Sequence, residues 1–164
     1  MKTRPTPYVA GPTGRHETDP TPAARTAGGR AAGGDAPPPR VLLCERGPSG
    51  ATPIYTALQA LGIEPVRCHD PKALLEEAVK RPPDVVICDL AIGSREDLFM
   101  LELLRRAAPA VPLILFASEG SLVTQKLVQG LRPIYYMVGP MEGPELQEAV
   151  EAALARRLRA RPGH

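Results

Sequence analysis

The 164-residue sequence has no tryptophan, and aromatic residues make up only 4% of the chain. Leucine, valine, isoleucine and alanine must therefore fill any hydrophobic core. The sequence also has no apolar run close to the roughly 18 residues needed to cross a bilayer. Its first residues carry positive charge but lack the apolar segment of a signal peptide, because prolines and a glycine interrupt them. We therefore expect a cytoplasmic protein without membrane insertion.

Neither the charge nor the cysteines indicate a specialised class of protein. The formal net charge is only +2, whereas a nucleic-acid-binding protein needs a concentrated basic patch, so we expect no nucleic-acid partner. Cys44, Cys68 and Cys88 have no metal-binding spacing and are an odd number, which argues against a zinc site and a disulfide framework. All three lie in expected strands and are predicted to be buried free thiols.

The first forty residues differ in composition from the rest of the chain. Residues 1–40 contain eight prolines and six glycines and almost no large apolar side chains. Such a segment cannot bury enough surface to offset its conformational entropy. We predict a disordered Pro/Gly-rich tail over residues 1–39, a domain over residues 40–160 and a short C-terminal tail over residues 161–164.

The most informative stretch lies near the middle of the chain. Val85, Val86, Ile87 and Cys88 form an apolar run too short for a helix but typical of a strand buried on both faces. Asp89 follows this run directly. In open α/β sheets, ligands and reactive groups gather at the carboxyl ends of the strands. Asp89 is therefore a candidate reactive group, a candidate metal ligand or the polar end of the strand.

Strand and helix patterns alternate along the rest of the domain. A proline at position 65 makes the second expected strand an edge strand, and Gly120 and Gly130 suggest a short, poorly anchored fourth helix. The alternation predicts an α/β fold, a five-stranded parallel sheet with helices on both faces. The expected strands are residues 41–44, 63–68, 85–89, 111–117 and 134–138.

Three segments carry a resemblance to a known family. The sequences PPDVVICDL at 82–90, VPLILFAS at 111–118 and YMVGP at 136–140 resemble the receiver domain of bacterial response regulators, in the same order and with similar separations. The resemblance covers about residues 40–158. It implies a flavodoxin-like sheet with strand order 2-1-3-4-5, and it places Asp89 at the position that a histidine kinase phosphorylates.

Other functional positions of that family are altered here. Glu45 matches the first member of the family's acidic pair, but Arg46 stands in place of the second. Gly139 replaces the lysine that precedes a proline after the fifth strand. Ala117 replaces the hydroxyl residue that ends the fourth strand, and Ser118 lies one position later, where strand alternation predicts another direction. These departures suggest an atypical receiver, or pseudo-receiver.

Arg46 could compensate for these losses. A guanidinium cannot bind Mg²⁺ but could form an ion pair with Asp89, which would depress the pKa of that carboxyl; the alternative is that Arg46 points to solvent. Glu45 and Asp89 remain the candidate metal ligands. Tyr136 aligns with the family's aromatic switch residue, and together with Tyr135 and Met137 it is predicted to contribute to an exposed apolar surface for partners.

Three functions remain open. The first is a pseudo-receiver that works by protein–protein interaction, with a histidine kinase or a downstream signalling protein as its partner. The second is a response regulator phosphorylated at Asp89, the one case in which Mg²⁺ would be needed. The third is a flavodoxin-like binder of a small molecule or nucleotide. The sequence contains no catalytic constellation, so we expect neither an enzyme nor a bound cofactor.

Overall fold

The computed structural model describes residues 37–46, 52–90, 95–118, 120–140 and 143–160. The chain divides into two units, Met1–Ala36 and Pro37–His164, and every described residue belongs to the second. The tails predicted for residues 1–39 and 161–164 therefore lie outside the described residues, apart from residues 37–39.

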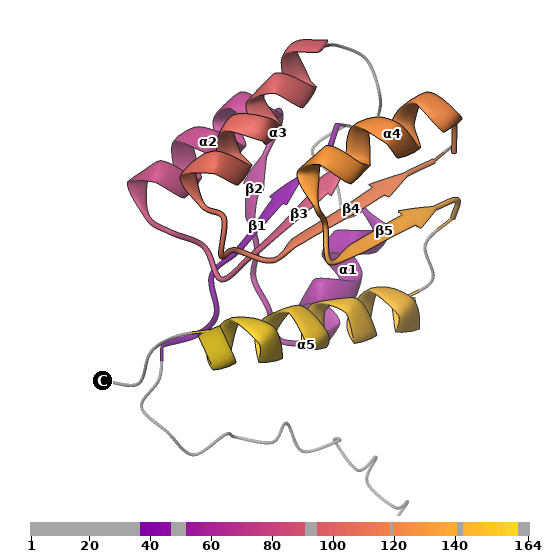
Figure 1. The fold of residues 1–164 in the computed structure, drawn as a ribbon. Helices are drawn as coiled ribbons and strands as arrows, with labels where there is room; N and C mark the ends of the chain where they lie inside the picture. Colours follow the sequence, from indigo (N-terminus) through magenta and orange to yellow (C-terminus); the bar gives the residue numbers. More distant parts are fainter. Residues whose placement is uncertain (1–36, 47–51, 91–94, 119, 141–142, 161–164) are drawn as a thin grey trace, which may run out of the picture. The chain divides into compact units, whose positions relative to one another are not determined.

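The described residues form five strands in one parallel sheet, with the order β2-β1-β3-β4-β5 (Figure 1). The fold class and the strand order expected from the sequence are both confirmed. Three strands, β2, β4 and β5, are shorter than expected, and each begins directly after a proline or one residue later, because proline cannot donate to the sheet. The strands are β1 Val41–Cys44, β2 Val66–Cys68, β3 Val85–Asp89, β4 Leu113–Ala117 and β5 Tyr135–Val138.

Five helices connect and follow the strands within the same residues, and they cover both faces of the sheet (Figure 1). Three of them, α2, α3 and α4, pack on one face, and α1 and α5 pack on the other. None of these helices combines the length and apolar content needed to cross a membrane. The helices are α1 Pro53–Ala60, α2 Pro71–Lys80, α3 Arg95–Ala107, α4 Leu122–Leu131 and α5 Gly143–Ala160.

Strand alternation divides the core between the two faces. In β3, Val86 and Cys88 belong to the core beneath α2, α3 and α4, while Val85 and Ile87 belong to the core beneath α1 and α5. All four side chains are at most 1% exposed. The central strand is therefore buried on both faces, as its unbroken apolar run predicts. Asp89 is the first side chain of this strand that is not fully buried.

The fourth helix differs from the expectation. It runs for 10 residues, its Val128 and Leu131 are buried against the sheet, and Ser121 caps its first turn by accepting a hydrogen bond from the backbone N–H of Thr124. It ends at Arg132, whose φ of 47° lies in the left-handed region. The prediction of a short, poorly anchored helix was wrong, because a hydroxyl cap and two apolar anchors outweigh the cost of one internal glycine.

Candidate functional site

A depression of about 330 Å³ lies at the carboxyl edge of the sheet. It gathers every pocket residue singled out from the sequence, because the carboxyl ends of parallel strands meet at the same edge. These residues are Glu45, Arg46, Asp89, Ala117, Ser118 and Gly139. Its other walls are largely apolar and come from Pro53, Ile54, Phe116 and Pro140, and Thr52 completes it.

Glu45 follows β1 and is held by two side chains that the sequence did not single out. It is only 8% exposed, and the Thr52 hydroxyl lies 2.6 Å from its Oε1 and 2.8 Å from its Oε2. The Arg67 guanidinium, which projects from β2, lies 3.6 Å from its Oε2 and also stacks over the ring of Tyr55. Thr52 accepts the N–H of Tyr55 as the N-cap of α1. The carboxylate is thus part of a local network.

Arg46 pairs with a different acid from the one expected. Its guanidinium forms a hydrogen-bonded ion pair with the carboxylate of Asp97 in the first turn of α3. The hypothesis of an Arg46–Asp89 ion pair was wrong in its partner. A guanidinium at this position can reach α3 as well as the sheet, and the acidic first turn of that helix supplies the carboxylate that it binds.

Asp89 is half-buried at the end of β3, and within the described residues its carboxylate makes no hydrogen bond or ion pair. Burial raises the pKa of this carboxyl above its ordinary value, and the charge of Glu45 raises it further. Arg46 opposes both effects, but less strongly. The sequence-based expectation of a depressed pKa is therefore corrected, because desolvation outweighs a guanidinium committed to another acid.

These residues do not fit a Mg²⁺ ion. Mg²⁺ prefers octahedral coordination by oxygen, with one or two carboxylates that are free to bind it. Both oxygens of Glu45 already accept the Thr52 hydroxyl, and a guanidinium lies beside one of them. Within the described residues, no group of three or more acidic, histidine or cysteine side chains could hold a metal ion. Asp89 alone is an available ligand.

The ends of β4 and β5 provide no positive group. Ala117 is 1% exposed, and Ser118 is exposed and lines the same depression as Asp89. Gly139 has a φ of 101°, which strains any other residue, although a Cβ added there would meet nothing within 4 Å. A lysine at position 139 would therefore have space but would require this backbone turn to change.

Tyr136 is partly buried, with its ring turned toward the core. Its ring packs against the core beneath α2, α3 and α4, and its hydroxyl is buried without a hydrogen-bond partner among the described residues. Leu115 is its register partner in β4. The alanine at position 117 removes the hydroxyl residue that the family places at the end of that strand. The role of Tyr136 in an exposed surface for partners stays a prediction, because its ring is only partly buried.

The more exposed apolar side chains of α4 and β5 belong to other residues. In β5, Tyr136 and Met137 pack against the core. The residues on either side of them are more exposed, Tyr135 at 37% and Val138 at 49%. Leu122 and Leu127 of α4 are also exposed. The sheet register places Tyr135 on the face covered by α1 and α5 and Val138 on the face covered by α4. We call Leu122, Leu127 and Val138 the α4–β5 surface.

The three thiols lie side by side just below the depression. Cys44 of β1 is the register partner of Cys68 in β2 and of Cys88 in β3. All three are free and buried, as expected. Burial raises the pKa of Cys68 to about 11. A side-chain hydrogen bond with Cys44, followed by burial, raises the pKa of Cys88 well above its ordinary value. Thiols that stay protonated are poor nucleophiles, so we interpret these three cysteines as structural residues of the core.

Three residues of the site escaped the sequence analysis: Thr52, Arg67 and Asp97. Thr52 had a local signal, since a hydroxyl residue before a proline is typical of a helix N-terminus. Arg67 and Asp97 had none, because each meets its partner only after separate strands and a helix assemble.

The order β2-β1-β3-β4-β5, with three helices on one face and two on the other, is the doubly wound flavodoxin-like class, and its ligand edge lies where Asp89 sits. Among solved structures, the chain is similar to a CheY-like receiver domain protein from Methanospirillum hungatei (15% identity, TM-score 0.67, 75% of this chain and 98% of that one). It is also similar to the signal receiver domain of a modulated diguanylate cyclase from Desulfovibrio desulfuricans (20% identity, TM-score 0.65, 76% and 100%). The fold is therefore that of response-regulator receiver domains.

The curated relatives agree with this fold. The chain is 23% identical over 115 residues to the transcriptional regulatory protein ZraR of Escherichia coli O157:H7, a match that covers 70% of this chain. It is 22% identical to ZraR of Salmonella typhimurium over the same length. The chain spans about a quarter of these relatives, since each match covers 26% of their length. No protein-family model matches the chain.

Proposed function

We propose that the chain is a pseudo-receiver, a cytoplasmic bacterial signalling module that acts by protein–protein interaction and does not depend on Mg²⁺-assisted phosphorylation of Asp89. The observation that carries this proposal is the state of Glu45. Its two oxygens are occupied by Thr52, and Arg67 neutralises its charge. Phosphoryl transfer would need Glu45 to help hold a divalent cation, and these contacts compete with that role. The described residues of the site include no catalytic constellation, and we propose that the protein is not an enzyme.

The altered strand ends support the same proposal. Phosphoryl transfer to a carboxylate depends on positive groups aimed at the developing charge. Arg46 is committed to Asp97, Ala117 carries no hydroxyl, and Gly139 provides no amine. Asp89 therefore faces an environment that already disfavours its own negative charge.

The surface offered to a partner is the α4–β5 surface. Exposed apolar side chains near a sheet edge favour protein binding. The partner is proposed to be a histidine kinase or a downstream signalling protein. Val138→Ser should weaken binding to a purified partner without unfolding the domain, because Val138 is 49% exposed. Phe99→Ser, at an apolar side chain of α3 that is 54% exposed, is the matched control. Equal binding by all three proteins would contradict this assignment.

A second candidate function is a response regulator phosphorylated at Asp89 by a histidine kinase. It is favoured by the position of that carboxylate, which is half-buried, lines the depression beside Ser118 and has no ion-pair partner among the described residues. A dedicated kinase could supply positive groups that this chain lacks.

One experiment separates the two functions. The intact mass of the full chain is measured after incubation with acetyl phosphate and Mg²⁺, and again after incubation with a panel of purified histidine kinases and ATP. Asp89→Asn is the control. The pseudo-receiver predicts no adduct in either incubation. A labile phosphoryl adduct on the wild-type chain that is absent from the Asp89→Asn variant would overturn the first proposal and establish the second.

A further inference from the structure

A second depression lies at the opposite edge of the sheet, close to the amino ends of β3 and β4. It measures about 490 Å³ and shares no residue with the depression around Asp89. The C-terminal part of α2, the segment between α3 and β4, and Arg157 of α5 form its walls. Most of its surface is apolar and comes from alanines, prolines and valines. We call it the basic groove, after the charges described below.

Arg157 brings an unsatisfied donor into this groove. Its Nε is buried and has no hydrogen-bond partner among the described residues. The acid beside it is Asp84, whose Oδ1 lies 3.8 Å from that Nε, which is beyond hydrogen-bond range, while its Oδ2 accepts the backbone N–H of Arg40 at 2.9 Å. A guanidinium has five N–H donors, and the Arg157 side chain as a whole is 19% exposed. A carboxylate entering the groove would therefore meet the donors of this guanidinium other than the buried Nε.

The surroundings of the groove are strongly basic. Arg105 of α3 lies near Arg132, the C-cap of α4, and Arg156 of α5. Burial lowers the pKa of Arg105, and the positive charges of Arg156 and Arg132 lower it further. Lys80 and Arg81 are exposed at the end of α2. Of the two acids on this helix, Glu77 already pairs with Arg40 and with Lys80, and Glu76 is exposed. The positive charge at this edge therefore exceeds the charge of the acids that face it.

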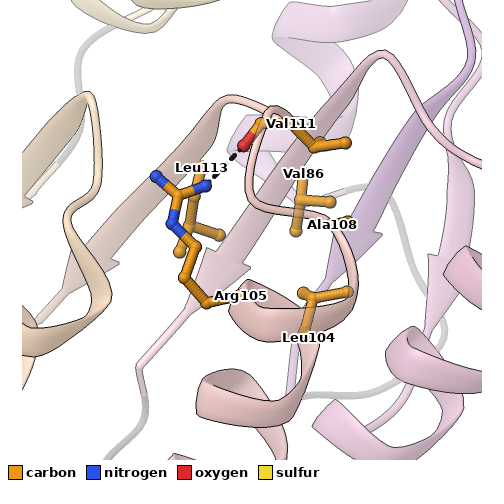
Figure 2. A pocket seen from close by; sticks show the side chains of 6 residues that line it. All are labelled: Val86, Leu104, Arg105, Ala108, Val111 and Leu113. Atoms are coloured by element: carbon orange, nitrogen blue, oxygen red, sulfur yellow. Dashed lines mark hydrogen bonds between the residues drawn. The ribbon is translucent and has the colours of Figure 1, made fainter.

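The groove is also held in shape before any partner arrives. Arg105 donates from Nη1 to the carbonyl of Val111 and from Nη2 to the carbonyl of Arg132, each at 2.7 Å (Figure 2 shows the first bond). Val111 and Ala108 line both the groove and a cavity of about 10 Å³ beside it, which has room for about one water (Figure 2). A wall fixed in advance lowers the entropic cost of binding.

We propose that the basic groove binds an acidic peptide segment of a partner protein, with one carboxylate on Arg157 and an aliphatic neighbour on the wall formed by Val79, Pro82 and Ala110. Charge complementarity selects an acidic partner, and the aliphatic wall selects a peptide. Among the residues that line the groove there is no aromatic ring on which a nucleic-acid base could stack. The groove lies away from Asp89, so this inference goes beyond the function proposed above.

The test uses the full chain and a fluorescently labelled peptide of alternating Asp and Leu residues, with binding followed by anisotropy. Arg157→Gln removes the donor. Val79→Glu places a negative charge on the rim at a side chain that is 69% exposed, so it should not disturb folding. Each variant should weaken binding by about tenfold or more, as expected for one lost charge-assisted contact. Arg159→Gln, on the same helix but outside the groove, should change affinity by less than about twofold.

Three outcomes would overturn the proposal. The first is the absence of saturable binding of the Asp/Leu peptide. The second is a loss of affinity in Arg159→Gln as large as that in Arg157→Gln, or binding of a peptide in which every Leu is replaced by Gly that is as tight as binding of the Asp/Leu peptide. Either result would mean that only net charge determines the affinity. The third is tighter binding of duplex DNA with the same dependence on Val79 and Arg157, which would make the groove a nucleic-acid site. If Arg157→Gln unfolds the domain, as circular dichroism would show, Val79→Glu alone decides.

Discussion

The two edges of the sheet handle their polar groups in opposite ways. At the amino edge, two arginine side chains donate hydrogen bonds to backbone carbonyls. Arg40 donates to the carbonyls of Glu77 and Arg81. Arg105 donates to the carbonyls of Val111 and Arg132. Ion pairs occur at both edges, but among the described residues the arginines of the carboxyl edge, Arg46 and Arg67, contact acidic side chains and no backbone carbonyl. That pairing leaves the Asp89 carboxylate without a hydrogen bond or ion pair among the described residues.

The difference indicates what each edge does for the protein. A guanidinium that satisfies two carbonyls joins separate segments of chain, so the arginines of the amino edge stabilise the fold. A half-buried carboxylate with a raised pKa costs stability and is retained where binding or chemistry uses it. Deleting a polar group should therefore destabilise the protein at the amino edge and stabilise it near Asp89. Arg157 is an exception at the amino edge, and there the unsatisfied donor marks the basic groove.

The largest effect is expected at the amino edge. Arg105→Ala removes two charge-assisted hydrogen bonds and should lower the free energy of unfolding by about 2 kcal/mol. Arg106→Ala, at the exposed neighbouring position, should change it by less than about 0.5 kcal/mol. Urea denaturation of both variants measures the difference. Equal effects would mean that the two carbonyl contacts contribute nothing beyond surface charge.

A paired group at the carboxyl edge should behave like the amino edge. Thr52→Ala removes the N-cap of α1 and the two short contacts to Glu45, and we expect a loss of about 1.5 kcal/mol. Thr52→Ser keeps the hydroxyl and is the control. If both variants lose the same stability, the methyl group rather than the hydroxyl would be responsible.

Tyr136 tests the cost of an unpaired buried group. Tyr136→Phe removes a hydroxyl without a partner among the described residues while keeping the ring, so it should raise the free energy of unfolding by about 1 kcal/mol. Tyr135→Phe, on the exposed neighbour, should leave it within about 0.5 kcal/mol. A loss of stability in Tyr136→Phe would mean that the hydroxyl has a partner after all.

The smallest effect belongs to Asp89 and depends on pH. Because the folded state raises the pKa of this carboxyl, ionisation costs the folded state stability as the pH rises from the ordinary value of 3.8 through the raised one. Asp89→Asn removes that cost and should stabilise the protein at neutral pH by about 0.5 kcal/mol, discounted for partial exposure.

The comparison between wild type and Asp89→Asn should be made at several pH values. The gain should disappear below pH 3.8, where the carboxyl is protonated in both the folded and the unfolded states. A gain that is the same at every pH would show that the amide helps for reasons other than charge.

The fold could be predicted from the sequence to a large extent. The unbroken apolar run at Val85–Cys88 and its alternation with helical patterns require a parallel sheet with helices on both faces, and this is what the described residues form. The gathering of Glu45, Asp89 and Gly139 at one edge follows from the same pattern. The helix over Leu122–Leu131 was underestimated, because glycines were weighed and the serine cap was not.

The pairing of the site's charges could not be predicted in this way. Arg46 pairs with Asp97, 51 positions away in the chain, rather than with Asp89. Glu45 pairs with Arg67, 22 positions away. Such choices depend on small differences in distance and desolvation between competing acids. Likewise, the sequence did not indicate that the hydroxyl of Tyr136 is buried while the neighbouring Tyr135 is exposed.

By itself, the sequence determined which residues form strands and helices and which strand ends meet, because hydrophobic periodicity and proline placement act locally and repeat along the chain. Only the tertiary structure decided which carboxylate remains unpaired and which hydroxyl is buried. It also decided that the basic residues of α2, α3 and α5 meet around an apolar groove. Each of these outcomes depends on distances between side chains from separate elements, and those distances exist only once the sheet and its helices have packed together.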